Sequence, residues 1–188
     1  MIILNAKDLI KDIDILLNYK EFLLIFILPL FLTFIITGYI GLERQNIGKE
    51  AGISAHLLVG LASTGIAILQ RVIYKNQLDL VADGVLIDPE AQRIIAQVLT
   101  GVGFIGAGVI LKDKDRIISG ITTAATIWTA SIIGIILGSG YIVLGTLLGI
   151  VVIAFITIRD IVRGINPLIP IEKQRRKGRN LNDDNFHF

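Results

Sequence analysis

Cysteine is absent from this chain of 188 residues. That absence excludes a disulfide framework, a thiolate nucleophile and a cysteine-ligated metal site. Charge is absent from residues 117–158, which contain no Asp, Glu, Lys or Arg and are interrupted only by Gly138-Ser139-Gly140. Two consecutive apolar runs of this length are not expected in a soluble domain. A helix that crosses the hydrocarbon core of a bilayer, in contrast, needs about 20 apolar residues. The stretch therefore predicts two spanning helices joined by a tight turn.

The N-terminus lacks the apolar region of a cleavable signal peptide, because six charged residues lie among the first 20. What the sequence has in abundance is hydrophobic residues, at 53% of the chain, with a mean hydropathy of +0.73. These values are typical of a membrane protein. We predict an all-α, polytopic transmembrane helical bundle with about five spanning helices. The spans are expected at residues 22–42, 55–74, 94–111, 118–137 and 141–158.

Lysine and arginine are distributed unevenly, with six on the N-terminal side of the five predicted crossings and twelve on the opposite side. Because cytoplasmic segments carry the excess, we predict an external N-terminus and a cytoplasmic C-terminus. Residues 1–21 are expected to form an amphipathic segment, either lying in the external interface or extending the first span. Residues 22–158 form the membrane domain. Residues 159–188 are expected to be a short basic tail without a soluble C-terminal domain, whose basic run marks topology rather than binding lipid.

Residues 101–106 match the dinucleotide-binding pattern G-x-G-x-x-G. That pattern requires a preceding strand and an acidic residue about 20 positions later. Here the glycines lie in an apolar run, and residues 120–124 contain no acid. We predict instead that the glycines allow neighbouring helices to approach closely. Further pairs of small residues four positions apart favour a tight bundle or an oligomer. The glycines of this motif region are Gly101, Gly103, Gly106 and Gly108.

Polar side chains inside the predicted spans are the main candidate functional residues, because polar groups in hydrocarbon need partners or a hydrated cavity. One set recurs at helical spacing on the third span, where a functional and a purely structural role are equally open. A second set, on the fourth span, bonds either across helices, which we favour, or to its own helix one turn back. The first set is Arg93, Gln97 and Thr100, and the second is Thr122, Thr123, Thr126 and Thr129, beside Trp128.

Charged residues at the ends of the spans are further candidates. Glu43 and Arg44 close the first span, where they contact a neighbouring loop or mark the membrane boundary. Asp88, followed by proline, is expected to cap the third helix, although it could pair with Arg93 or a cation. An external loop from Asp79 to Glu90 is acidic, but its spacing matches no metal motif. We assign no role to His56 and predict no metal or cofactor site.

Several segments together resemble the MgtC/SapB family of bacterial inner-membrane proteins. The resemblance implies a multi-pass protein linked to adaptation to low magnesium and, in pathogens, to survival inside host cells. It also implies modulation of other membrane proteins, including the ATP synthase, rather than carriage of Mg²⁺. The segments are residues 41–44, residues 48–52 with His56, Asp88-Pro89 with Arg93, Ala96 and Gln97, residues 101–110 and residues 120–128.

The sequence therefore leaves two candidate functions for this chain. The first is a non-enzymatic membrane regulator that binds another membrane protein or a second copy of itself, such as a dimer, with membrane lipids and without nucleic acid. The second is a transporter or channel for Mg²⁺ or a similar cation. Cation carriers place acids within the membrane, and the interiors of the predicted spans contain none. A hydrated pore lined by Thr and Gln stays open. We expect the regulator and no enzymatic activity.

Overall fold

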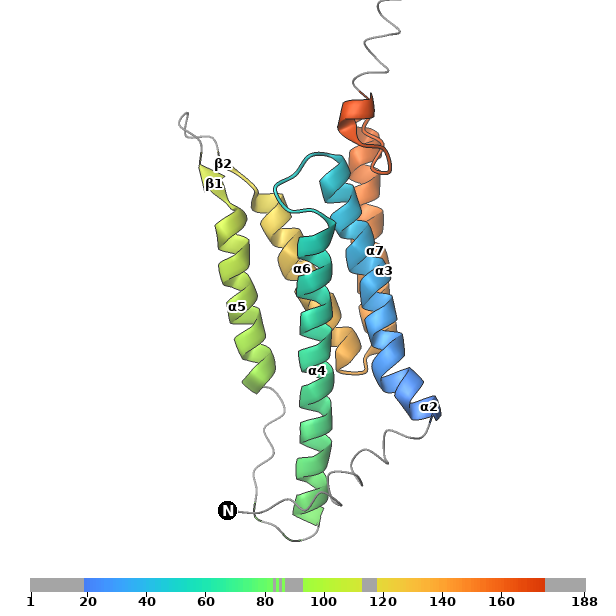
Figure 1. The fold of residues 1–188 in the computed structure, drawn as a ribbon, viewed down its shortest axis with the longest axis vertical. Helices are drawn as coiled ribbons and strands as arrows, with labels where there is room; N and C mark the ends of the chain where they lie inside the picture. Colours follow the sequence, from blue (N-terminus) through green and yellow to red (C-terminus); the bar gives the residue numbers. More distant parts are fainter. Residues whose placement is uncertain (1–18, 83, 85, 87–92, 113–117, 175–188) are drawn as a thin grey trace, which may run out of the picture.

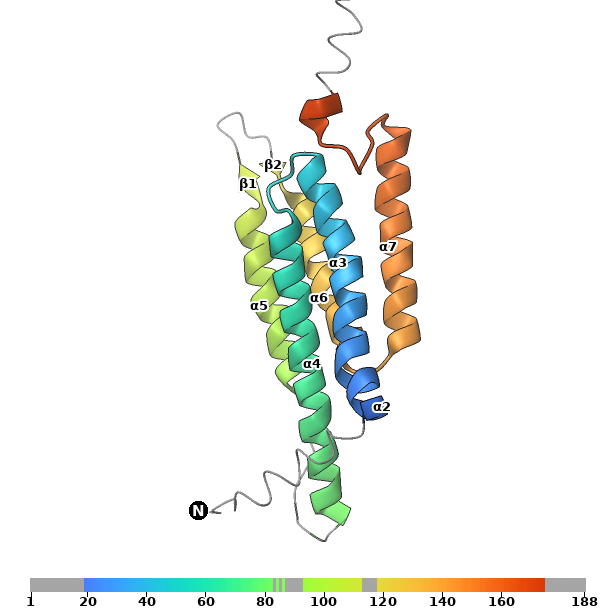
Figure 2. The ribbon, with the colours of Figure 1, turned by 45° about the vertical axis from the view of Figure 1, so that its right-hand side comes forward.

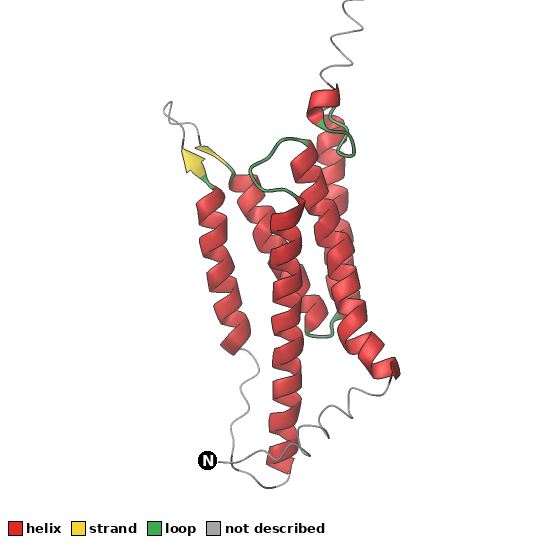
Figure 3. Ribbon diagram, in the orientation of Figure 1, coloured by secondary structure: helices red, strands yellow, loops and turns green. Residues whose placement is uncertain are grey.

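The computed structural model describes residues 19–82, 84, 86, 93–112 and 118–174. Within these ranges the protein is a bundle of long helices with one short hairpin at one end (Figures 1 and 3). The predicted all-α membrane fold is confirmed. Most of the predicted amphipathic segment, the candidate Asp88 and the basic residues after position 174 lie outside the described residues.

The first predicted span is a continuous run of helical structure. It consists of α2 (Tyr19–Phe22), a π-helical segment (Leu23–Ile27) and α3 (Leu28–Asn46). Pro29 has no N–H to donate, and because it lies within this continuous run, the helix loses one backbone hydrogen bond there. The wider π turn directly precedes it, and α2 bends away from the axis of α3 at this point (Figure 1).

The second span is longer than the sequence predicts. Helix α4 (Ile53–Ala82) has 30 residues and continues about two turns beyond the predicted end at residue 74. The prediction that Asp79 belongs to an external loop is therefore wrong, since Asp79 lies on the last turns of this helix. Residues 75–82 combine four polar and four apolar side chains, and this mixed composition sustains a helix without resembling a membrane span.

Helix α5 (Arg93–Val109) and helix α6 (Ile121–Gly138) are joined through a hairpin. Its strands, β1 (Leu111–Lys112) and β2 (Ile118–Ser119), pair antiparallel, with Leu111 opposite Ser119. Gly120 begins α6 with a φ of +83°, and a Cβ there would collide with the carbonyl oxygen of Val109. Glycine is required at this corner for both reasons.

The predicted tight turn between the last two spans is confirmed. Helix α6 ends at Gly138, and helix α7 (Ile142–Val162) begins four residues later. Gly140 has a φ of +95°, and the guanidinium of Arg71 lies 2.6 Å from where its Cβ would be. The turn is thus packed against α4 as well as conformationally restricted to glycine.

Helix α6 is the central helix of the bundle (Figures 1 and 2), with 61% of its most apolar 18-residue window buried, against 17% for α7. Gly134 and Gly138 of α6 lie directly against the backbone carbonyl oxygens of Gly60 and Thr64 on α4. The absence of side chains at these glycines therefore sets the separation of α4 and α6. The larger apolar core lies between α3, α6 and α7 and comprises Ile36, Ile40, Ile133, Leu137 and Ile156.

Four helical stretches are long and apolar enough to cross a membrane: residues 23–46, 53–82, 121–138 and 142–162. Helix α5 is apolar but has 17 residues. At 1.5 Å per residue it extends about 26 Å, slightly less than the roughly 30 Å hydrocarbon core. The chain is a multi-pass membrane protein, and the fifth crossing stays a prediction.

Candidate functional site

One end of the bundle collects most of the buried charge, and we call it the basic end. It is formed by residues 43–53, 118–123 and 159–167, which come from α3, α4, α6, α7 and their connections. It lies at the top of Figure 1. The side chain of Asn46 donates a hydrogen bond to the carbonyl oxygen of Pro167 at 2.8 Å, which holds the segment after α7 against the end of α3.

A four-residue cluster of carboxylates and guanidiniums lies at the centre of the basic end. Glu43 and Arg44 are each 1% exposed and form a two-point ion pair with one another on α3. Arg159 of α7 donates to Glu43 Oε1 at 3.0 Å and to Asp160 Oδ1 at 2.7 Å. The cluster therefore ties α3 to α7 through Arg159, with equal numbers of acidic and basic groups.

One oxygen of this cluster has no partner. Asp160 is 1% exposed, and its Oδ2 is buried without a hydrogen-bond partner among the described residues. An unpartnered buried carboxylate oxygen is costly unless neighbouring positive charge offsets it. Arg159 and Arg44 supply that charge, so the cluster depends on both arginines.

Two further contacts join the basic end to α6. His56 of α4 is fully buried and lies 2.8 Å from the carbonyl oxygen of Gly52 and 2.9 Å from the hydroxyl of Thr126. Thr123 donates to the carboxylate of Glu50 at 3.1 Å. The hydrogen bond from the backbone N–H of Glu50, together with the Thr123 hydroxyl, lowers the pKa of this exposed carboxyl, which is therefore charged at neutral pH.

His56, to which the sequence assigns no role, is buried inside the bundle rather than at its boundary. It is part of the packed contact between α4 and α6, and Gly41 makes room for it because its missing side chain would lie 3.1 Å from the Cβ of His56. Thr126 bonds across helices to His56, the role favoured for the threonines, and also donates to the carbonyl oxygen of Thr123 on its own helix at 2.8 Å. Thr123 bonds to Glu50, which lies in the loop before α4. Thr129 instead bonds to Ala125 on its own helix at 2.8 Å.

A cavity of about 400 Å³ opens beside the cluster. Four cationic side chains and one carboxylate line it, together with the hairpin and the first turn of α6. The cationic residues are Arg44, Lys49, Arg159 and Arg163, the carboxylate is Glu50, and Ser119, Thr122 and Thr123 supply hydroxyls.

The polar stripe predicted on the third span lies at the opposite end of the molecule. Arg93 and Gln97 border a cavity of about 360 Å³ that Gln70 and Gln77 of α4 line from the other side. The Oε1 atom of Gln77 is buried there without a described partner. Thr100 is exposed and bonds to Ala96 of its own helix at 3.1 Å, so the stripe is divided between a cavity and the outer surface.

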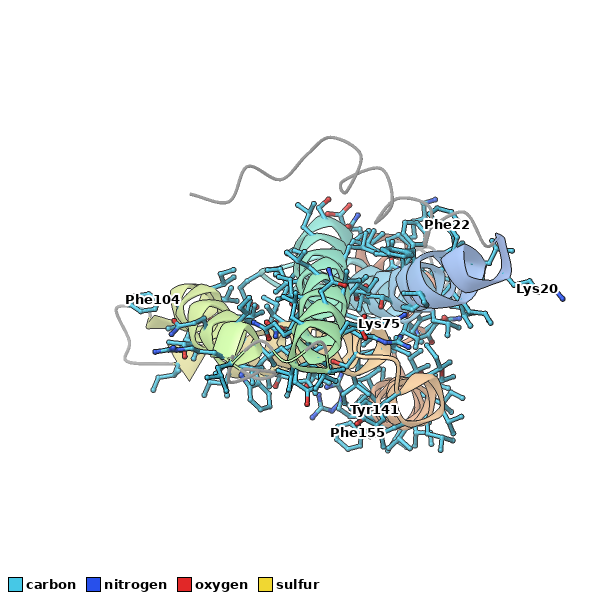
Figure 4. All side chains as sticks on the ribbon, turned by 90° about the horizontal axis from the view of Figure 1, so that it is seen from below. Lys20, Phe22, Lys75, Phe104, Tyr141 and Phe155 are labelled. Atoms are coloured by element: carbon cyan, nitrogen blue, oxygen red, sulfur yellow. The ribbon has the colours of Figure 1, made fainter. Side chains whose placement is uncertain are left out.

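The glycines of residues 101–108 pack less than the sequence predicts. Among the described residues, only Gly106 approaches another helix, with its Cβ position 3.7 Å from Ala124 of α6. Gly101, Gly103 and Gly108 have no heavy atom of another described element within 4 Å. Within the described residues Gly106 therefore fits the prediction, whereas for Gly101, Gly103 and Gly108 a close approach to a helix of another molecule stays a prediction. Phe104 on the same helix is 82% exposed and points away from the bundle (Figure 4).

Of the other candidates, Glu43, Arg44 and Thr122 lie in the basic end, whereas Trp128 is 46% exposed on the outside of α6. The sequence analysis missed Arg159 and Asp160. Both stand directly after the fifth predicted span, on the side where Glu43-Arg44 closes the first. Two acid–arginine pairs at the same membrane depth were the signal that could have found this cluster.

Comparison with known proteins places the chain in a family. The family model described as "MgtC family" matches residues 30–164. The putative magnesium transporter YhiD of Escherichia coli K12 is 48% identical over 120 residues, which cover 64% of this chain and 54% of that protein. Protein SapB of Bacillus subtilis is 37% identical over 103 residues, covering 54% and 42%. Protein MgtC of Brucella abortus is 30% identical over 109 residues, covering 58% and 40%.

No solved structure matches the chain. The chain spans about half the length of these curated relatives, or somewhat less. The family model covers most of the chain, including the Glu43–Asp160 cluster and the cavity beside it. The chain belongs to the MgtC family.

Proposed function

We propose that this chain is a non-enzymatic, multi-pass protein of the bacterial inner membrane that supports adaptation to scarce magnesium by modulating another membrane protein. The observation that carries the proposal is the placement of acids on the described spanning helices. Glu43 and Asp160 lie at the basic end and are bonded to arginines, and Asp79 is exposed near the end of α4. Carriers of cations usually place an acidic residue within the membrane, and these described helices place none at mid-depth.

The packing at mid-depth agrees with a regulator. Hydroxyls there bond to each other across helices, at 2.8 Å between Thr33 and Thr64 and at 2.8 Å between Ser63 and Ser131. Close glycine contacts fill the rest of the contact between α4 and α6. Polar groups that satisfy one another in this way leave little to coordinate a passing ion.

The exposed face of α5 supports a partner in the membrane. Gly101 and Gly108 are open on one side of α5 and Gly103 on another, with exposed Phe104 between them, because 3.6 residues make one helical turn. A second membrane helix can approach closely where side chains are missing. Either another membrane protein or a second copy of this chain would fit, and a homodimer is the simplest form of the second case.

A Mg²⁺ transporter or channel is the second candidate, because the 48% identical relative is named a putative magnesium transporter. The cavity between α4 and α5, lined by Gln70, Gln77 and Gln97, is the feature that favours it. Amide oxygens there could contact a hydrated Mg²⁺, which gives up its water reluctantly.

Flux and growth measurements separate the two functions. Proteoliposomes containing the full chain and an internal Mg²⁺-sensitive dye are expected to show no Mg²⁺ entry above protein-free vesicles, with an ionophore as positive control. In a deletion strain, the chain is expected to restore growth at limiting Mg²⁺ without raising cellular Mg²⁺ uptake. Saturable entry that Gln97→Leu abolishes and Gln174→Leu leaves intact would establish the transporter instead.

A partner on α5 is tested separately. Gly103→Leu adds a large side chain at a position where a Cβ meets no described heavy atom within 4 Å, so the protein should fold normally but lose growth rescue. Leu147→Ala on α7, also at an exposed position, is the matched control and should retain rescue. Full rescue by Gly103→Leu would show that this face is not where the partner binds.

A further inference from the structure

The cavity at the basic end has the features of an anion site. It is about 400 Å³ in volume, within the range of small-molecule pockets. Four cationic side chains from three separate segments converge on it: Arg44 from α3, Lys49 from the following loop, and Arg159 and Arg163 from the end of α7. Convergence from distant parts of the sequence distinguishes it from a simple basic stretch of surface.

The carboxylates nearby compensate only part of this charge. Glu43 is bonded to Arg44, and Asp160 is bonded to Arg159. Two cations, Lys49 and Arg163, then face one lining carboxylate, Glu50. The lining of the cavity therefore has a net charge of about one positive unit. The side chains of Lys49 and Arg163 are both exposed, so they are accessible to a ligand in the cavity.

The first turn of α6 adds hydrogen-bond donors to the same cavity. Residues 120–123 line it, and no side chain caps this helix, because its N-cap is Gly120. The first N–H groups of a helix lack partners within it, and the helix dipole places partial positive charge at that end. Helix α6 has 18 residues, so the dipole is fully developed. The hydroxyl of Thr122 also lines the cavity, as does that of Ser119, which bonds to the carboxylate of Glu50.

We propose that this cavity binds a phosphate group, with Lys49 and Arg163 as the cationic ligands and the first turn of α6 as the backbone donor. Guanidinium, ammonium, hydroxyl and helix N-terminal N–H groups are together the set that recognises phosphate oxygens. An excess of about one charge suits a phosphodiester or a phosphate monoanion. The cavity lies at the end of the membrane bundle, so the group can come from a phospholipid headgroup or from a soluble phosphate.

The test uses the full chain in an uncharged maltoside detergent. In one arm, phosphatidylglycerol or phosphatidylcholine is added, and native mass spectrometry counts retained lipid. In the other arm, inorganic phosphate is titrated and its ³¹P signal is followed. We expect saturable binding in at least one arm, weakened about tenfold by Arg163→Gln, since a charge-assisted hydrogen bond is lost. Lys173→Gln removes an equal charge from an exposed residue outside the cavity and should bind like the wild type.

Glu50→Gln is expected to change the binding affinity in the opposite direction from Arg163→Gln, because it removes the one carboxylate that lines the cavity. Binding should tighten severalfold, a result that misfolding would not produce. Retention of phosphatidylglycerol alone identifies a headgroup, whereas a response to inorganic phosphate identifies a soluble ligand. No saturable binding in either arm, or equal weakening by Arg163→Gln and Lys173→Gln, would overturn the proposal. The assay gives its answer whether or not the chain transports Mg²⁺.

Discussion

Individual buried charges at the basic end hold separate helices together. Arg159 bridges Glu43 on α3 and Asp160 on α7, so its guanidinium is shared between two acids. Breaking a buried ion pair by removing one partner is strongly destabilising, because the remaining charge is left uncompensated. The cluster is therefore sensitive to changes that keep side-chain volume and remove only charge.

Glu43→Gln is expected to lower the free energy of unfolding by about 3 kcal/mol, since Arg44 and Arg159 both lose a buried carboxylate. Thermal unfolding in detergent, followed by circular dichroism, measures the change. Glu172→Gln alters an exposed acid on the tail and should have little effect. Equal stability of Glu43→Gln and the wild type would show that the cluster contributes nothing to the fold.

Thr126→Val is expected to destabilise the protein by about 1–3 kcal/mol, because it leaves the buried Nε2 of His56 without its partner at nearly constant volume. Thr129→Val is the matched control on the same helix, and its hydroxyl bonds only to its own turn. The difference in melting temperature between the two variants measures the contact between helices. Equal melting temperatures of the two variants would show that the His56–Thr126 hydrogen bond makes no net contribution to stability.

At the scale of the elements, α4 and α6 are held at a distance that only glycine permits. A Cβ at Gly134 would meet the carbonyl oxygen of Gly60, which is backbone and cannot move aside without shifting α4. The glycines of α5 stand in contrast, because three of them face open space. Glycines of α6 thus allow a close contact between helices of this chain, whereas most glycines of α5 lie on its exposed surface.

Gly134→Ala is therefore expected to lower stability by about 1–3 kcal/mol through overpacking. Gly103→Ala should leave stability unchanged or raise it by up to about 1 kcal/mol, since alanine favours helix and meets no neighbour. Melting curves of the two variants in the same detergent provide the measurement. Opposite behaviour, with Gly103→Ala the less stable, would mean that the face of α5 is buried in the purified protein.

For the whole molecule, the orientation predicted from the lysine and arginine distribution can be measured directly, because the chain has no native cysteine. A cysteine at Asn76, exposed near the end of α4, is expected to react with an impermeant maleimide in intact cells. A cysteine at Gln174, beyond the basic end, should react only after permeabilisation. Labelling in the reverse order would place the basic end outside.

The membrane fold could be predicted from the sequence because hydropathy acts locally. The uncharged run at residues 117–158 requires lipid whatever its neighbours are, and Gly138-Ser139-Gly140 dictates a turn through its own backbone. The end of α4 was missed because its last turns are too polar to resemble a span, although they are helical. Hydropathy indicates which residues are solvated by lipid, and it does not indicate how far a helix continues beyond the membrane.

The sequence by itself determined that this protein is a helical membrane bundle with a basic C-terminal side, and its motifs carried the resemblance to a family. Only the tertiary structure decided which polar residues matter together. Glu43 and Asp160 are 117 positions apart, and His56 and Thr126 are 70 apart. Side chains so distant in sequence meet only when α3, α4, α6 and α7 pack, because burial and hydrogen bonding depend on neighbours in space rather than along the chain.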